Sequence, residues 1–201
     1  MTERGRPRAF DRAEALRRAM EVFWEHGYEG TSVTDLTTTM GISSPSLYAA
    51  FECKEALFRE AIELYGTLQG GVTARALREE PTARASIEAM LRDNAAAYTT
   101  EDTPHGCMVV LAGTTYTTKS ETVRDFLGEC RSGTQADIRA RIRRGVDDGE
   151  LPEGVEPAAV AEFYAAVLYG MSVRARDGAS RAELAKVVDG AMAAWAPLTG
   201  T

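Results

Sequence analysis

The chain has 201 residues, with 44% hydrophobic and 26% charged side chains and a net charge of −7, a composition typical of a globular protein. Its longest apolar run, 108–113, is too short to cross a bilayer, and the N-terminus lacks the apolar stretch of a signal peptide, so we expect a cytoplasmic protein without a membrane partner. Three widely spaced cysteines, two histidines and the lack of a phosphate loop or nucleophile–base spacing indicate no disulfide framework, metal, cofactor or enzyme site.

Positive charge gathers at the start of the chain although the chain as a whole is acidic. Residues 1–18 contain six arginines, at positions 4, 6, 8, 12, 17 and 18, against three acidic residues. A basic arm on an acidic body is compatible with docking one end of the protein onto phosphates.

Helix signals recur from end to end, and no stretch shows the sustained alternation typical of a β-strand. Asp11 with Glu14 resembles a capping box that starts the first helix, and Gly27 supplies a stop. Ser32 with Asp35 starts the second helix in the same way. We therefore expect an all-α fold of about nine helices, near 11–26, 32–40, 43–51, 54–68, 82–100, 107–114, 120–147, 157–176 and 181–196.

Three glycines, at positions 66, 70 and 71, loosen the chain near the end of the fourth expected helix. Closely spaced glycines are typical of a junction between domains, so we place a domain boundary near 66–80. We expect a small N-terminal domain at 1–66, a larger helical bundle at 67–201, and the helix at 54–68 as the link between them.

The segment GISSPSLYAAF, residues 41–51, is unusual for a helix. Proline and serine are poor in helix interiors but favourable in the first turn, so Ser43 or Ser44 is expected to cap a helix of barely two turns. A tight turn at Gly41 and Ile42 joins it to the preceding helix, which is the arrangement of a helix-turn-helix. If the apolar residues bury together, the N-terminal end of the short helix faces outward, and in this motif that end enters the major groove.

The stretch EGTSVTDLTTTMGISSPSLYAAFECKEALF, with the preceding FWEHGYEG, closely resembles the DNA-binding domain of the TetR (tetracycline-repressor/AcrR-like) family of transcriptional regulators. The resemblance covers roughly residues 8–66, and the helical remainder has the length of that family's effector-binding and dimerisation domain. It implies a homodimeric repressor that binds a near-palindromic double-stranded DNA operator through recognition helices about 34 Å apart. It also implies release by a small-molecule effector, which we expect to be apolar or amphipathic, with the helix at 54–68 as the lever.

The resemblance implies contacts of two kinds, to base edges and to the DNA backbone. It assigns the base contacts to Ser44, Pro45 and Ser46, at the start of the recognition helix. The candidates for mainly backbone contacts are Ser32, Thr34, Tyr48, Lys54 and the arm residues Arg4, Arg6 and Arg8. Many members have an aromatic residue or histidine where this chain has Ala49 and Ala50, so we expect fewer phosphate contacts here.

Aromatic and sulfur-containing residues recur at helical spacing in the C-terminal part, a pattern that is ordinarily core packing. A bundle that switches nevertheless needs a cavity, which is usually apolar with a few polar anchors. The candidate effector-binding residues are Tyr98, Met108, Tyr116, Phe126, Cys130 and Tyr164, with Thr114, Thr115, Thr117 and Thr118 beside them in sequence.

The last two expected helices combine small residues, which permit close helix approach, with apolar ones. Two such hairpins from two subunits would form a four-helix dimer interface. Packing within a single chain is the other interpretation of the same pattern. The candidate interface residues are Phe163, Val167, Gly170, Met171, Leu184, Val188 and Trp195.

Two further functions stay open on the sequence alone. A helical small-molecule or protein-binding module without DNA binding is favoured by the acidic net charge and by Ala49 and Ala50. A thiol-redox-responsive regulator would act through Cys53, because a thiol beside Lys54 at a helix N-terminus lies in a positive environment that raises its reactivity.

Overall fold

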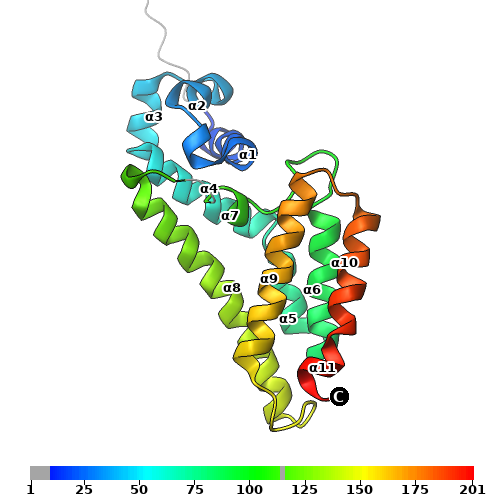
Figure 1. The fold of residues 1–201 in the computed structure, drawn as a ribbon. Coiled ribbons are helices and arrows are strands. Elements are labelled where there is room, and N and C mark those ends of the chain that lie inside the picture. Colours follow the sequence, from blue (N-terminus) through cyan, green and yellow to red (C-terminus); the bar gives the residue numbers. More distant parts are fainter. Residues whose placement is uncertain (1–9, 114–115) are drawn as a thin grey trace, which may run out of the picture.

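The computed structural model describes residues 10–113 and 116–201, and within these ranges the chain is helical without any strand, which confirms the all-α prediction (Figure 1). The helices are α1 (Arg12–Gly30), α2 (Val33–Met40), α3 (Ser44–Phe51), α4 (Lys54–Leu68), α5 (Gly71–Glu79), α6 (Ala83–Ala97), α7 (Met108–Leu111), α8 (Glu121–Asp147), α9 (Pro157–Arg176), α10 (Arg181–Ala193) and α11 (Trp195–Thr199), with a 3-10 turn at Thr118–Ser120. No helix in the described ranges is long and apolar enough to span a membrane. Arg4, Arg6, Arg8, Thr114 and Thr115 lie outside them.

Helix α5 lies where the sequence predicted no helix, and α11 continues past the end of the helix expected at 181–196. Helix α4 ends at Leu68 as predicted and Gly70 lies in the break before α5, but Gly66 is inside α4 and Gly71 is the first residue of α5. The reason is tertiary: α5 buries Ala76 and Leu77 in the bundle core, and that burial outweighs the poor helix propensity of glycine.

Local capping explains where the first helices begin. Ser32 and Asp35 form the predicted capping box, with the Asp35 N–H 3.1 Å from the Ser32 hydroxyl oxygen. Asp11 caps α1, but Glu14 pairs with arginines instead of completing a box. The expected stop at Gly27 is a kink with φ 71°, after which the helix continues to Gly30.

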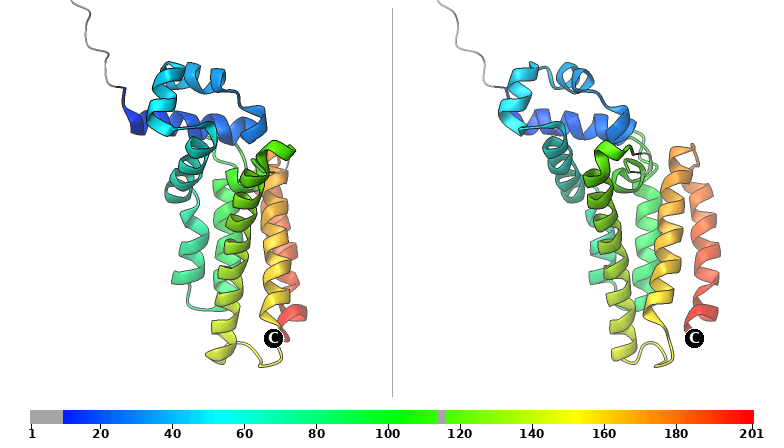
Figure 2. Two further views of the ribbon diagram at one scale, coloured as in Figure 1. Left: turned by 90° about the vertical axis from the view of Figure 1, so that its left-hand side faces the viewer. Right: turned by 60° about the vertical axis from the view of Figure 1, so that its left-hand side comes forward.

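The small domain of α1–α3 lies across one end of an elongated bundle, in which α6, α8, α9 and α10 run along the long direction (Figures 1 and 2). Helix α4 packs against α1 and leads from the small domain towards α5. Among the described residues, α4 is therefore the covalent link between the recognition helix and the bundle.

The apolar core of the small domain does not stop at the end of α4. It contains buried residues of α1 to α4 together with Met108, Ala112, Val123 and Leu127, which come from α7, the residue after it, and α8. The second core lies between the long helices of the bundle. Two segments distant in sequence thus complete the core that supports the helix-turn-helix.

Candidate DNA-binding surface and effector cavity

The turn between α2 and α3 has the geometry of a helix-turn-helix. Gly41 takes the left-handed conformation, with φ 69° and ψ 31°, which glycine adopts without steric cost. Leu36, Met40, Leu47 and Phe51 are buried beneath the turn and fix the two helices against each other. Ser43 is the N-cap of α3, as one of the two expected candidates.

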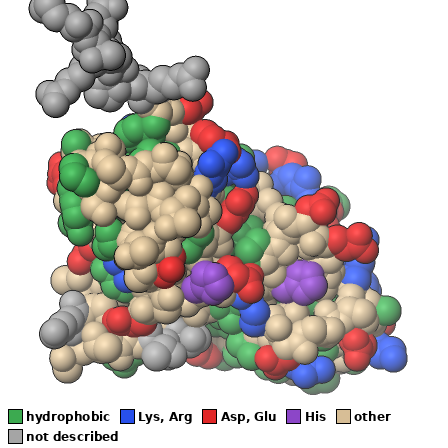
Figure 3. All heavy atoms as spheres, turned by 90° about the horizontal axis from the view of Figure 1, so that it is seen from above, with side chains coloured by type: hydrophobic (Ala, Val, Ile, Leu, Met, Phe, Trp, Pro, Cys, Tyr) green, Lys and Arg blue, Asp and Glu red, His purple; other side chains and the backbone are tan. Residues whose placement is uncertain are grey.

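The outward face at the start of α3 carries the side chains expected to meet bases. Ser44 and Pro45 are exposed, and so is Tyr48, with 47% of its surface accessible to solvent. Ser46 is half-buried, and its hydroxyl lies 2.8 Å from that of Ser43, so it also supports the cap. Seen from above, the described part of this end presents mainly uncharged side chains (Figure 3). The structure therefore gathers small, mostly uncharged groups where close approach to a base edge is needed.

Ser32 and Thr34 are exposed at the start of α2, on the same small domain. The Ser32 hydroxyl donates to the Asp35 carboxylate at 2.6 Å, and the Ser32 N–H donates to it at 2.8 Å. These bonds hold the pKa of Asp35 below its ordinary value, because they stabilise the charged form. A carboxylate that is charged at neutral pH thus stands next to both predicted backbone contacts.

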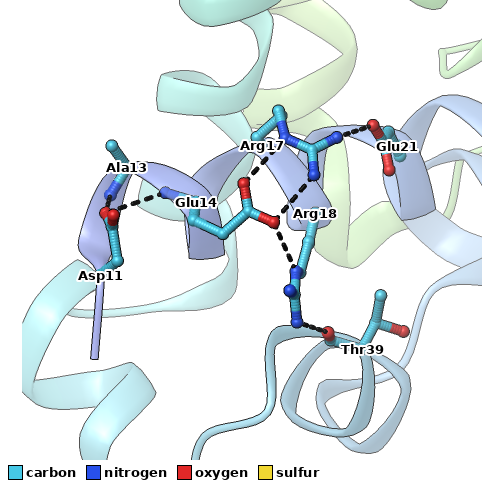
Figure 4. A network of polar contacts seen from close by, with 7 residues as sticks. All are labelled: Asp11, Ala13, Glu14, Arg17, Arg18, Glu21 and Thr39. Atoms are coloured by element: carbon cyan, nitrogen blue, oxygen red, sulfur yellow. Dashed lines mark hydrogen bonds and ion pairs between the residues drawn. The ribbon is translucent and has the colours of Figure 1, made fainter.

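Three arginines counted towards the basic arm are paired with carboxylates. Arg12 lies 2.8 Å from Glu60, and Arg17 and Arg18 share Glu14 (Figure 4). Arg18 also reaches the carbonyl of Thr39 at 3.4 Å, which ties α1 to the end of α2. Their positive charge is largely neutralised within the domain, which the count of arginines alone did not reveal.

The shared arginines make the stability of α1 depend on pH. They hold the pKa of the Glu14 carboxyl at about 2, below its ordinary 4.5. A lowered folded-state pKa contributes stability that is present above the unfolded value and is lost as the pH falls through the folded value. We therefore expect Glu14→Gln to reduce the free energy of unfolding near neutral pH, and the difference from wild type to shrink as the pH is lowered from about 5 to about 3.

Urea unfolding at several pH values measures this difference, with Glu101→Gln as the matched control. Glu101 is exposed and forms no ion pair among the described residues. A Glu14→Gln deficit that is constant across the whole pH range would show that the carboxylate acts through packing rather than charge.

Lys54 does not point freely into solvent. Its ammonium donates to the Tyr28 carbonyl at 2.6 Å and lies 4.1 Å from the centre of the Tyr28 ring. Desolvation lowers the pKa of Lys54. The predicted phosphate contact therefore requires the ammonium to leave the end of α1, a constraint that the sequence pattern did not indicate.

Cys53 is the exposed N-cap of α4, and its sulfur accepts from the Ala56 N–H at 3.4 Å.

A cavity of about 450 Å³ lies in the bundle, with walls from α4 to α9. Of the predicted effector residues, Tyr98, Phe126 and Cys130 line it. Other wall residues were not predicted, because their sequence pattern is that of core packing or of no particular site. They include Tyr65, Asn94, Cys107, Arg131 and Tyr169.

Three predicted effector residues lie elsewhere. Met108 is fully buried in the core of the small domain. Tyr164 is fully buried in the bundle and donates its hydroxyl to the Ala191 carbonyl at 3.2 Å. Tyr116 is 50% exposed at the surface, where the Arg124 guanidinium lies 5.2 Å from its ring. Helical periodicity locates an apolar face, but it cannot tell whether that face meets a cavity, a core or solvent.

Some polar groups of the cavity wall are already bonded within the protein. Asn94 donates to the Thr73 hydroxyl and to the Met90 carbonyl, both at 2.8 Å, and Tyr169 donates to the Arg131 carbonyl at 2.7 Å. Burial raises the pKa of Tyr98 and of Tyr65 well above the ordinary value. Both hydroxyls therefore stay protonated and uncharged over the physiological pH range.

The comparisons with known proteins agree with this architecture. Residues 15–61 match the bacterial regulatory proteins of the tetR family, and residues 81–191 match the tetracyclin repressor-like C-terminal domain. The chain is 34% identical over 200 residues to the HTH-type transcriptional repressor ComR of Escherichia coli K12, across 97% of this chain and 93% of ComR. The chain belongs to the TetR family.

Two further relatives extend this result. The TetR-family chain is 28% identical over 180 residues to the HTH-type transcriptional repressor BdcR of the same organism, across 90% of this chain and 86% of BdcR. It is also similar to a cysteine-substituted form of the TetR family transcriptional regulator CifR in complex with a 26-base-pair operator DNA. That likeness has 47% sequence identity and a TM-score of 0.91, across 95% of this chain and 100% of CifR. The chain is thus a DNA-binding transcriptional regulator, not a helical module without DNA binding.

A cluster of hydrogen bonds, which we call the Arg176 latch, ties the small domain to the bundle in this TetR-family chain. Arg176, the last residue of α9, donates to the carbonyls of Trp24 at 2.7 Å, Glu25 at 2.9 Å and His105 at 2.9 Å. The Trp24 indole N–H in turn donates to the Gly106 carbonyl at 3.1 Å. The latch thus consists of Arg176, Trp24, Glu25 and the turn 105–107, and it joins α1, α9 and the α6–α7 connection.

The Arg176 latch also borders the cavity. The Cys107 N–H donates to the Ser172 hydroxyl at 2.8 Å, and the Gly106 N–H donates to the Tyr98 carbonyl at 3.0 Å. Cys107 and Tyr98 are both cavity wall residues. The Trp24 ring packs edge-on against Tyr65, a third wall residue, with ring centres 4.9 Å apart. Displacement of the cavity wall would therefore act directly on Trp24, in the C-terminal half of α1.

The predicted dimer residues divide into two groups. Met171, Leu184, Val188 and Trp195 are buried inside the single chain, so they build the bundle core and not an outer surface. The reason is that their side of each helix faces α6 and the neighbouring helix. The outward side of α9 and α10 carries the half-buried Phe163 and Val167 and the exposed Gly170, Val173 and Val187.

Proposed function

We propose that this TetR-family chain represses transcription as a homodimer, in the cytoplasm, by binding a near-palindromic double-stranded DNA operator. A small apolar or amphipathic molecule that enters the cavity lowers its affinity for that operator. The names of ComR and BdcR as repressors, and of CifR as a regulator in complex with operator DNA, support the first part. The position of the cavity supports the second.

The observation that carries the proposal is that one helix belongs to both sites. Helix α4 contributes Ile62, Tyr65 and Gly66 to the cavity wall, and its first residues follow directly on the recognition helix α3. A ligand that fits the cavity better when α4 is displaced shifts the protein towards that state. The size of the shift is limited by the ligand's differential affinity for the two states.

The wall chemistry favours a largely neutral effector. Most of the lining is apolar or aromatic, and the ionisable wall residues Glu63, Arg131 and Asp137 bring charges of both signs. An effector with several charges of one sign would meet both attraction and repulsion there. Such an inducer, if bound in this cavity, would contradict the proposal.

The outer face of α9 and α10 fits a second copy of the chain. It presents the exposed small residues Ala166, Gly170, Gly190 and Ala193, and it also exposes Val173 and Val187 at 42% and 40%. Small residues let helices approach closely, and the two valines add apolar area. A dimer is also required on functional grounds, because one recognition helix contacts too few base pairs for useful specificity.

The DNA-binding part of the proposal is tested with Tyr48→Phe. The hydroxyl is expected to bond a phosphate, so its loss should weaken operator binding about tenfold, and by a similar factor for all operator sequences because phosphates carry no sequence information. Operator fragments recovered from the source genome and titrated by fluorescence anisotropy measure the effect. Tyr116→Phe is the control, since this tyrosine is equally exposed but lies outside the helix-turn-helix. Unchanged affinity of Tyr48→Phe would remove Tyr48 from the contact set.

The effector part is tested by blocking the cavity. Gly133 is an exposed residue of the cavity wall, and a Cβ atom there would meet no atom within 4 Å, so Gly133→Trp adds an indole ring at the wall without a clash. A compound that raises the melting temperature of wild type and releases DNA should do neither in Gly133→Trp. The control is Gly154→Trp, at an exposed position outside the cavity. Equal responses of both variants would place the effector elsewhere.

A further inference from the structure

Two of the three cysteines of the chain belong to the wall of the effector cavity. Cys107 and Cys130 both line it, and both are half-buried. The third, Cys53, is exposed at the start of α4 and lies outside the cavity. A cysteine sulfur is a strong nucleophile, so a ligand in this cavity lies against two groups that can react with an electrophilic carbon atom.

Cys107 lies beside two tyrosine hydroxyls of the same wall. Tyr65 and Tyr98 line the cavity, and only 4% of each residue is exposed. Burial is the main cause of the raised pKa of both tyrosines, and their interaction with the Cys107 thiol raises the pKa further. The Tyr98 hydroxyl has no nitrogen or oxygen partner among the described residues. Since sulfur is a weak acceptor, this buried hydroxyl retains a donor for a ligand oxygen in the cavity.

Cys130 is in a different environment. Burial raises the pKa of its thiol and outweighs the opposing effect of Arg131. A raised pKa lowers the fraction of the reactive thiolate, and no tyrosine hydroxyl acts on Cys130. Of the two thiols in the cavity, only that of Cys107 is placed beside a hydrogen-bond donor that can activate an electrophile.

Cys107 is also part of the turn 105–107 in the Arg176 latch. The preceding two carbonyls of this turn accept from the small domain and from α9: Gly106 from the Trp24 indole at 3.1 Å, and His105 from Arg176 at 2.9 Å. A group added to the Cys107 sulfur occupies space next to these hydrogen bonds. A covalent change in the cavity therefore acts on the turn that connects the bundle to α1.

We propose that Cys107 is the reactive group of the effector site and that the effector is a small neutral α,β-unsaturated ketone or aldehyde, an inference that rests on the proposed function. The Tyr98 hydroxyl donates to the carbonyl oxygen and so makes the β-carbon more electrophilic. The Cys107 sulfur forms a bond to the β-carbon, and the carbon–carbon π-bond breaks. The thiol loses its proton and the α-carbon gains one, so the addition needs no oxidant or further reactant. The neutral thioether displaces the turn 105–107, loosens the Arg176 latch and lowers the affinity for operator DNA.

The test treats the full chain with cyclohexenone, and with cyclohexanone as the matched ketone that lacks the reactive double bond. Intact-mass and peptide mass spectrometry should find one cyclohexenone adduct, on Cys107, and none with cyclohexanone. After removal of free reagent, operator binding should be about tenfold weaker than before treatment. Cys107→Ser should form no adduct and keep its DNA affinity, whereas Cys130→Ser and Cys53→Ser should respond as wild type does.

Tyr98→Phe tests the role of the hydroxyl. Its adduct with cyclohexenone should form about tenfold more slowly, because the donor to the carbonyl oxygen is lost. Methyl methanethiosulfonate, which reacts with thiols but has no carbonyl group, should react with Cys107 in this variant as fast as in wild type. Equal slowing with both reagents would show that Tyr98 only packs against the thiol and would overturn its assigned role.

Three results would overturn the proposal as a whole: no adduct in wild type, an adduct on Cys130 instead of Cys107, or a Cys107 adduct with unchanged operator affinity. The repressor function is tested separately by the untreated protein. Failure of untreated wild type to bind any operator would contradict that function, whereas the mass of the adduct is measured without DNA.

Discussion

Replacing Arg176 by alanine is expected to lower both the stability of the chain and its affinity for operator DNA, although Arg176 lies outside the helix-turn-helix. The change removes charge-assisted hydrogen bonds to the carbonyls of Trp24, Glu25 and His105. The Arg176 side chain is 26% exposed, so most of it is packed against the protein. We expect the free energy of unfolding to fall by about 2–4 kcal/mol.

The expected loss in DNA affinity has a different origin. Without the Arg176 latch, the small domain has more orientations relative to the bundle, and operator binding must restrict them. A cost of about 1.4 kcal/mol in this step corresponds to tenfold weaker binding. Urea unfolding and operator titration measure the two effects separately.

Arg174→Ala is the control for this prediction. Arg174 lies on α9 close to Arg176, but its exposed side chain makes no hydrogen bond or ion pair among the described residues. Arg174→Ala should behave as wild type in both measurements. If Arg176→Ala unfolds at a lower urea concentration than wild type but binds the operator as tightly, the Arg176 latch stabilises the chain without positioning the small domain.

The second large effect is expected at Gly106, in the turn of the Arg176 latch. Gly106 has φ +81°, and a Cβ atom there would lie 2.6 Å from the Ser172 carbonyl oxygen and 2.7 Å from Leu111 Cδ1. The Ser172 carbonyl belongs to the backbone of α9 and cannot yield without moving the helix. Gly106→Ala should therefore combine backbone strain with overpacking and cost about 2–4 kcal/mol of unfolding free energy. It should also weaken operator binding, because the Trp24 indole loses its acceptor position.

Gly178→Ala separates these two causes. Gly178 has φ +91°, which imposes the same kind of backbone strain, but a Cβ atom there would meet no atom within 4 Å. It should cost about 1 kcal/mol, at the lower end for an unfavourable backbone conformation. The difference between the two variants in urea unfolding measures the collision alone. Equal losses would mean that the turn yields around the added methyl group.

The features predictable from the sequence are those determined by neighbouring residues. The capping box of Ser32 and Asp35, the cap at Ser43 and the left-handed Gly41 each depend on a few consecutive positions. The buried set under the turn follows from helical periodicity. For the same reason the outward face of α3 was identified correctly, since a short helix with one buried side has only one other side to present.

The features that the sequence did not predict depend on pairs of residues far apart in the chain. Arg176 and Glu25 are separated by 151 positions, and nothing near either residue indicates the other. Lys54 is drawn to the Tyr28 carbonyl by the packing of α4 against α1, which a phosphate-contact pattern cannot reveal. Met171 and Gly170 are adjacent, yet only Met171 faces the core, so an apolar face alone does not locate an interface between copies.

The continuity of the small domain's core with α7 and α8 bears on how this chain can be recombined with others. Consider a hybrid protein that takes only residues 1–66 from this chain and the rest from a relative. The apolar surfaces of α1 and α4 would then pack against the relative's residues in place of Met108, Ala112, Val123 and Leu127. Functional hybrids should therefore require that the segment 107–127 is transferred together with the helix-turn-helix. Operator preference should be easiest to change by substitutions on the exposed face of α3, because these leave the contacts of the small domain with α7 and α8 unaltered.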